Sequence, residues 1–448
     1  MFWLFILCAS IAKNTNRDFS MSLKARQSKE KRFQFAGLAA ISIGLLCLVM
    51  LFASVLSAGL PAFQQTFIKL TFDLPADKLD KSGNRNPQEM KKVSTIGYAK
   101  VITEQLKLNL TRAGLEFDQL SKKELKNMIS KEAPAQVRYA VLEDPSLLDR
   151  EFEMVLLANG RIDGYYKGRV SKKSAKLDVM VSPKQLDLAD QMKRMGILET
   201  RFNGRFFYWP DASDLRPEAA GLGVALLGSF YMILIVLVLA VPLSVCTAVF
   251  LEEFAPKNWF TDLIEINISN LAAVPSIVFG ILGLSLFINF MDLPQSAPIV
   301  GGLCLTLMTL PTVIIAARAS IKAVPPSIKA AALGLGASKV QAVFHHVLPS
   351  AAPGILTGTI IGLAQALGET APLLLIGMVA FVREYPALSP EGIFEPATAL
   401  PVQVFNWTVR GDPAFVERAS GAIIVLLCFM ITMNLLAIVL RKRFERRW

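Results

Sequence analysis

A glutamate stands inside one of the long apolar runs of this chain, in the pentapeptide Gly368-Glu369-Thr370-Ala371-Pro372. A carboxylate in a membrane-spanning segment is costly, so it normally faces a partner charge or a wet cavity. Pro372 removes a helical hydrogen bond, and Gly368 lets another backbone approach closely. A helix broken here would expose backbone N–H groups, which are suitable ligands for anions. Glu369 therefore has two interpretations, as part of a pathway or gate, or as the structural partner of a neighbouring helix.

A second candidate is the stretch 318–353, which is basic and contains no acidic residue. Pro325-Pro326-Ser327 predicts the end of one helix and the start of another, because proline fits the first helical turn and breaks a helix interior. Ala330-Ala331-Ala332 then gives the new helix a surface of small side chains. Leu333 and Leu335 are expected to pack inward.

The second half of this stretch predicts a helix-turn-helix hairpin. Gly336 allows a turn without Cβ strain. Ser338 is a suitable N-cap for a short helix from Lys339 to Val347, which we expect to stop at Leu348-Pro349. The alternative is an ordinary loop between membrane helices, whose alanines merely favour helix.

The hairpin resembles the EAA loop of ABC-importer permeases, which docks into a cleft of a cytoplasmic ATPase. Ala330 stands where that family often has glutamate, so no polar contact of such a glutamate carries over. The resemblance implies that the ATPase-coupling residues are Ala331, Ala332, Gly336, Ala337, Ser338, Leu348 and Pro349.

Further motifs resemble the A-type permeases of the phosphate-specific ABC importer, over about Pro217 to the C-terminus. Besides the pentapeptide at Glu369, they are Leu310-Pro311-Thr312 and the run 275–280. Gln365 and Ile315 stand at positions where many relatives have arginine; Arg318 is either a substitute or marks the cytoplasmic end of its span. The resemblance implies a translocation pathway or gate formed by Gly368, Glu369, Thr370, Pro372, Ser276 and Arg318.

The composition agrees with a membrane protein, because 53% of the 448 residues are hydrophobic. A spanning helix needs about twenty apolar residues. Six segments read as spans, although polar residues interrupt the start of the third: Phe35–Leu60, Gly221–Phe250, Leu263–Phe290, Pro298–Ala317, Gly354–Phe381 and Gly421–Leu440. The net charge of +11 lies largely in basic flanks of these spans, which indicates cytoplasmic anchoring and not a nucleic-acid partner.

Six spans place both termini on one side of the membrane, and the basic flanks place that side in the cytoplasm. The resemblance implies that this is a bacterial inner membrane. The expected divisions are a cytoplasmic segment 1–34, a first span 35–60, an exterior domain 61–220, a five-helix core 221–441 containing the loop 318–353, and a basic tail 442–448. Phe2–Ala12 is too short to span a membrane. Either Met21 is the true start, or the first residues form a short interfacial anchor.

Residues 61–220 are highly charged and predict a small periplasmic α+β domain. Ser121 and Glu124 form a capping-box pattern that starts a short helix, and Ser182-Pro183 starts another. Strands are expected at Phe152–Leu157 and Tyr165–Val170 around Asn159-Gly160, and again over Thr200–Tyr208 around Asn203-Gly204.

No catalytic site of its own is indicated. The sequence has no Walker A phosphate loop, its five cysteines show no metal-ligand spacing, and its two histidines, His345 and His346, are adjacent residues in the hairpin. The chain is therefore expected to bind no cofactor and no metal, with ATP and Mg held by a partner ATPase.

The resemblance implies an all-α polytopic permease of the type I ABC importer fold that carries an inserted α+β domain. It implies a sister permease, two ATP-binding subunits, an exterior phosphate-binding protein, inorganic phosphate as substrate and membrane lipid as surroundings. Two alternatives stay open. One is a permease for molybdate or sulfate, and the other is a membrane-anchored sensor whose active part is the domain 61–220.

Overall fold

A computed structural model describes residues 23–80, 83–378 and 381–444 of the chain. It divides into two compact units, residues 1–57 and Ala58–Trp448. The first unit holds most of α2 (Leu23–Gly59), a helix of 37 residues that is long and apolar enough to cross a membrane. The expectations for Phe2–Ala12 and Met21 lie outside the described residues.

The second unit begins with the inserted domain (residues 61–220), which is built on an antiparallel sheet in the order β2-β1-β3. The central strand β1 (Gln64–Asp73) pairs with β2 (Glu151–Leu157) in the register Leu70 to Met154, and with β3 (Leu198–Phe202) in the register Thr66 to Thr200. Apolar side chains of β1 are buried because helices cover the sheet.

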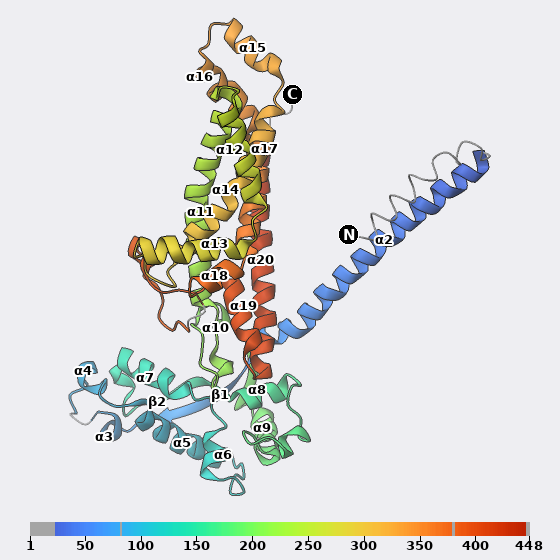
Figure 1. Cartoon of the computed structure of the whole chain (residues 1–448). Helices are drawn as coiled ribbons and strands as arrows, with labels where there is room; N and C mark the ends of the chain where they lie inside the picture. The colour runs from blue at the N-terminus through green and yellow to red at the C-terminus, as the bar shows by residue number, and fades with distance from the viewer. Residues whose placement is uncertain (1–22, 81–82, 379–380, 445–448) are drawn as a thin grey trace. The chain divides into compact units, whose positions relative to one another are not determined.

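Short helices and 3-10 turns surround this sheet (Figure 1). In chain order they are η2 (Leu60–Phe63), α3 (Ala76–Leu79), α4 (Pro87–Met90), α5 (Thr95–Arg112), α6 (Lys122–Lys126), α7 (Ala133–Glu143), η3 (Pro145–Leu147), α8 (Gly160–Tyr166), η4 (Ser174–Lys176), α9 (Pro183–Arg194), α10 (Arg205–Tyr208) and η5 (Pro217–Ala219). The capping box predicted at Ser121 is present, and α9 starts at Pro183 as expected, where Ser182 forms a second capping box. The α+β character of the domain is confirmed.

Two strand predictions in this domain are wrong. Residues 165–170, expected as a strand, begin in the last turn of α8, because the Asn159 side chain accepts a hydrogen bond from the Arg161 N–H and caps a helix instead of forming a hairpin turn. The second hairpin is also absent, although here the side chain of Asn203 does not cap the helix but donates to the carbonyl of Ala62. After β3 the chain passes Asn203 and forms α10.

The remaining chain forms a bundle of mostly apolar helices (Figure 1). These are α11 (Gly223–Val249), η6 (Phe250–Phe254), α12 (Trp259–Ala272), α13 (Ser276–Gly283), η7 (Leu284–Phe290), α14 (Pro298–Lys322), α15 (Pro326–Gly334), α16 (Lys339–Ala342), η8 (Val343–Val347), α17 (Leu348–Gly368), α18 (Ala371–Leu375), η9 (Pro390–Phe394), α19 (Leu400–Val409) and α20 (Pro413–Phe444). η6, η7 and η8 are π-helical turns that continue the helix before them.

Among the described residues, five helices are long and apolar enough to span a membrane, and a bent pair would make six. The bent pair is the expected third span, in which α12 and the continuous α13–η7 helix meet at 101°. Two polar side chains of α12 bond to carbonyls of their own helix, since Asn267 Nδ2 donates to Leu263 at 2.7 Å and Ser269 Oγ donates to Glu265 at 3.1 Å. The expected fifth span differs too, because α17 already begins at Leu348 and ends at Gly368.

Candidate functional site

The basic hairpin at 318–353 forms as predicted in its first half. α14 ends at Lys322, and α15 begins at Pro326 behind the double proline. Gly336 has a φ of +90°, a conformation that side chains with a Cβ rarely adopt. Ser338 then caps α16, accepting a hydrogen bond from the Gln341 N–H at 3.2 Å. The helix-Gly-helix arrangement is therefore present.

Two details of the hairpin differ from expectation. Leu333 and Leu335 do not pack inward; Leu335 is 91% exposed, and the buried side chain of this turn is that of Ala332. The helix does not stop at Leu348-Pro349 either. Pro349 lies in the first turn of α17, where proline is tolerated, so the chain stays helical from Lys339 to Gly368.

The hairpin is tied to the end of α11. Lys329 of α15 forms an ion pair with Glu253 in the π-helical turn η6, and the Glu253 side chain is only 10% exposed. Lys339 at the start of α16 places its Nζ 5.2 Å from the centre of the Phe254 ring. Both arms of the hairpin thus contact one turn of the bundle.

Arg318 lies in the next ion-pair group, beside the hairpin. Its Nε lies 2.7 Å from Glu252 Oε1, and its Nη2 lies 2.6 Å from Glu265 Oε1. These two carboxylates come from η6 and α12, so the guanidinium joins three segments of the bundle. A guanidinium paired with two carboxylates is already neutralised, and this arrangement favours a structural role for it. Its assignment to the pathway stays a prediction.

The helix break predicted at the pentapeptide is present. α17 ends at Gly368, Glu369 has an extended backbone with φ −78° and ψ 129°, and α18 begins at Ala371. The Glu369 carboxylate, half-buried at the break, has no hydrogen bond or ion pair with any described residue. The pairing with a neighbouring helix, which was one of the two interpretations, is thus not seen among the described residues.

The close backbone contact at the break comes from a different glycine than expected. Around Gly368 a Cβ would meet nothing within 4 Å, so this residue does not permit a close approach. Gly280 of α13 does: a Cβ there would lie 2.6 Å from Pro372 Cα. The run 275–280 therefore packs its last residue against the pentapeptide, and Ser276 is the half-buried first residue of that helix.

The two positions where arginine was expected carry no charge toward the break. Gln365 is exposed on α17, and Ile315 is 42% exposed on α14. The structure therefore brings together Gly280, Pro372 and the neighbouring Glu369, while Arg318 lies at the other end of α14, beside the hairpin. The candidate pathway residues thus form two separate groups, one at the helix break and one, Arg318, in the ion pairs beside the hairpin.

Comparisons with known proteins match the helical bundle. Residues 240–448 match the model of a binding-protein-dependent transport system inner membrane component, and residues 20–176 match a domain of unknown function, DUF3333. The probable ABC transporter permease protein YqgI of Bacillus subtilis is 36% identical over 230 residues, which are 49% of this chain and 78% of that protein.

Phosphate transport system permease protein PstA 1 of Mycobacterium tuberculosis (strain H37Rv) is 31% identical, over 51% of this chain and 72% of its own length. A solved structure, the inward-facing MetNI methionine ABC transporter, covers 50% of this chain and 97% of its own, with 13% identity and a TM-score of 0.39.

The chain is thus a polytopic membrane permease of the ABC-importer class. Within that class it belongs to the family of PstA-type permeases, with an additional domain that only the model of unknown function matches.

Sequence reasoning missed the carboxylates that hold the hairpin end together. Glu252, Glu253 and Glu265 were assigned no role. Their signal was present in the sequence, because acidic residues at the edge of a span need cationic partners, and Arg318 and Lys329 are cations at or beyond the end of another span.

Proposed function

We propose that the chain is one transmembrane subunit of an ATP-driven phosphate importer and forms half of its pathway. A sister permease, two ATP-binding subunits that carry ATP and Mg, and an exterior phosphate-binding protein complete the assembly. The observation that carries phosphate as substrate is the unpaired Glu369 at the helix break, in a family whose relatives include named phosphate permeases.

The carboxylate at the break suits phosphate better than sulfate. Hydrogen phosphate keeps a proton that it can donate to a carboxylate, whereas sulfate at neutral pH has none to donate. A carboxylate therefore accepts a hydrogen bond from the one anion and repels the other. A second role for Glu369 is to pair with an arginine of the sister permease and hold the gate closed.

Coupling to ATP hydrolysis is proposed to run through the hairpin. Closure of the ATPase subunits would displace α15 and α16, and Lys329 would pull Glu253 with them. Because Glu252 is the neighbour of Glu253 and pairs with Arg318, the displacement reaches α14 and α12. Exposed Leu335 at the hairpin turn would enter the ATPase cleft.

The orientation of the chain in the membrane follows from the proposal that the hairpin meets the ATPase. The hairpin and the inserted domain lie at opposite ends of the helical bundle in the unit Ala58–Trp448 (Figure 1). If the hairpin meets a cytoplasmic ATPase, the inserted domain lies on the outer side of the inner membrane. Both termini are then cytoplasmic, as the basic flanks of the spans favour.

The assignment is tested by what purifies with the chain. Solubilised in mild detergent from its own cells, the tagged chain should bring a second permease and an ATP-binding subunit, and the complex should hydrolyse ATP faster when the phosphate-loaded binding protein is added. Hydrolysis stimulated only by a sulfate- or molybdate-loaded binding protein would assign another oxyanion. A chain that purifies without any ATP-binding subunit would support the sensor alternative.

A further inference from the structure

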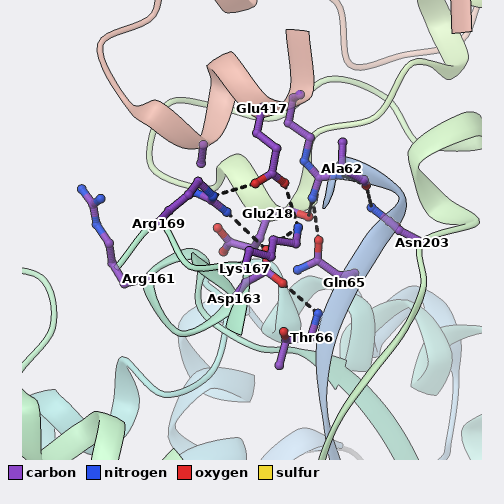
Figure 2. Close-up of polar contacts among 12 residues, drawn as sticks. Ala62, Gln65, Thr66, Arg161, Asp163, Lys167, Arg169, Asn203, Glu218 and Glu417 are labelled. Atoms are coloured by element: carbon purple, nitrogen blue, oxygen red, sulfur yellow. Dashed lines mark hydrogen bonds and ion pairs between the residues drawn. The ribbon is translucent and has the colours of Figure 1, made fainter. Parts of the chain in front are cut away.

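A buried group of charged side chains joins the inserted domain to the first turns of α20 (Figure 2). We call it the junction cluster. It has three cations and three carboxylates, which come from α8 and the residues after it, from η5 and from α20. The residues are Asp163, Lys167, Arg169, Glu218, Glu417 and Arg418.

Glu417 of α20 is held by two cations of the inserted domain. Lys167 Nζ lies 2.9 Å from Glu417 Oε1, and Arg169 Nε lies 2.6 Å from Glu417 Oε2. The same Lys167 Nζ lies 2.7 Å from Asp163 Oδ2. The Lys167 and Glu417 side chains are 3% and 5% exposed, so solvent cannot replace these contacts.

Arg418, the next residue of α20, is enclosed on its other side. Its Nη2 donates to Gln65 Oε1 at 2.5 Å and to the backbone carbonyl of Glu218 at 3.0 Å. Its Nη1 donates to the carbonyl of Ala62 at 3.3 Å, and its guanidinium lies over the Phe206 ring at 5.3 Å. One arginine of α20 thus contacts β1, the segment before it, and η5.

The apolar surroundings fix the same orientation. The Phe206 ring of the inserted domain stacks on Trp407 of α19 at 6.0 Å. A Cβ on Gly421, one turn after the cluster, would come within 2.6 Å of Ala62 Cβ. Any rotation or sliding of α20 against the domain would therefore leave buried charges unpaired or cause the backbones to clash.

The far end of α20 lies against α17. Arg441 Nη1 donates to Thr357 Oγ1 at 3.3 Å, and α17 is the helix that ends at the break beside Glu369. Rigid contacts thus continue from the inserted domain through α20 to the helix that carries the candidate gate.

We propose that the inserted domain and α20 form one rigid arm. A displacement of the inserted domain then shifts the gate at Glu369 through α20 and α17. The arm gives a function to a domain that matches a model of unknown function. This inference rests on the proposed function, because it needs a gate that opens and closes.

The first test measures rigidity with spin labels at exposed Lys173 of the inserted domain and exposed Val416 of α20, in the reconstituted complex. The expected result is one distance distribution that stays the same without nucleotide and with ATP trapped. A distribution that shifts between the two states would place a hinge at the junction and overturn the proposal.

The second test asks whether the arm acts on transport. Glu417→Gln keeps the shape of the side chain and removes its charge, so that Lys167 and Arg169 share Asp163 but lose the carboxylate that ties them to α20. Uptake per ATP hydrolysed should fall about tenfold, within the range of measured coupling between distant sites. The matched control is Glu153→Gln, which removes an exposed ion pair to Lys69 in the same domain and should leave uptake unchanged.

The outcomes separate the two proposals. If the wild-type complex takes up no phosphate, the proposed function is wrong. If the wild type is active and Glu417→Gln transports equally well, the arm does not act on the gate. Should Glu417→Gln fail to assemble, Glu417→Asp provides the comparison, because it retains the charge and is expected to regain part of the coupling.

Discussion

Arg318 Nε lies 2.7 Å from Glu252 Oε1, at the point where the hairpin leaves the helical bundle. The next residue of the chain, Glu253, pairs with Lys329 in the hairpin itself. Two adjacent carboxylates in one π-helical turn thus form ion pairs with two different parts of the structure, Glu252 with α14 of the bundle and Glu253 with the hairpin. This arrangement makes the turn η6 one route by which a movement of the hairpin reaches the bundle, beside the continuous helix from Lys339 to Gly368.

Reversing the charges of the Lys329–Glu253 pair tests this route. Each single change, Lys329→Glu or Glu253→Lys, should uncouple ATP hydrolysis from transport, because like charges then face each other. The double variant should recover coupling, with an interaction energy of roughly 0.5–3 kcal/mol in a double-mutant cycle of thermal unfolding. Lys322→Glu is the control, since this exposed lysine has no partner among the described residues. A double variant as defective as either single one would contradict the route.

The turn at Gly336 provides a matched pair of substitutions. Gly336→Ala must place a Cβ at a φ of +90°, whereas Gly334→Ala lies in the last turn of α15 with open space around it. The first should strain the hairpin by roughly 1–2 kcal/mol, and the second should slightly stabilise the helix. Co-purification of the ATP-binding subunit should drop for Gly336→Ala alone. Equal binding by both variants would show that the turn geometry is not required for docking.

Glu218 predicts a pH dependence of stability. Burial raises the pKa of its carboxyl from an ordinary 4.5 to about 7, although Ser130 donates a hydrogen bond to it and Arg418 lies nearby. A raised acid pKa means that the folded protein holds a proton which the unfolded chain has lost. Stability therefore decreases as pH rises from 4.5 toward 7, by up to about 1.4 kcal/mol per pH unit, and levels off above.

Glu218→Gln removes this titration, so its melting temperature should fall less between pH 5 and pH 7.5 than that of the wild type. Melting in detergent at several pH values measures the difference. Parallel curves for the two proteins would show that Glu218 does not titrate in this range.

Orientation can be measured without any transport. A cysteine at Lys339 in the hairpin should be protected from an impermeant thiol reagent added outside intact spheroplasts, in a background without the native cysteines. A cysteine at Lys173 in the inserted domain should react at once, because both side chains are exposed and the hairpin and the inserted domain lie at opposite ends of the bundle. The opposite labelling would reverse the membrane orientation.

The hairpin and the helix break were predictable because each depends on local backbone chemistry. Prolines, the glycine at 336 and the cap at Ser338 restrict φ and supply hydrogen bonds within a few residues. The wrong strand at Tyr165–Val170 shows the limit of the same reasoning. Asn-Gly suits a hairpin turn, but Asn159 is equally able to cap a helix, and tertiary packing decided between them.

The ion-pair groups could not be predicted, because their members are far apart in the sequence. Lys167 and Glu417 are separated by 250 residues, and only the folded chain shows that they meet. One ion pair of the cluster was predictable from the sequence. Asp163 on α8 and Lys167 at its C-cap are four residues apart, a spacing at which helical side chains meet. The partner on α20 depends on how the inserted domain packs, which no local pattern encodes.

The variant Glu369→Gln tests the role of the Glu369 carboxylate at the candidate gate. The variant nearly preserves side-chain volume, so assembly should remain, while uptake of phosphate should fall. If the carboxylate binds the substrate, ATP hydrolysis stays coupled but is weakly stimulated by the loaded binding protein. If it pairs with an arginine of the sister permease, hydrolysis becomes less dependent on substrate, because a broken buried pair costs about 3–5 kcal/mol. Normal uptake by the variant would make Glu369 structural.

The most direct measurement is ATP-driven uptake of labelled phosphate by the complex in proteoliposomes, with its binding protein added outside. The account predicts uptake that requires ATP, is not reduced by excess sulfate or molybdate, and is lost when the ATP-binding subunit is omitted. Uptake of sulfate or molybdate in place of phosphate, or no uptake by a complex that contains both permeases and hydrolyses ATP, would contradict it.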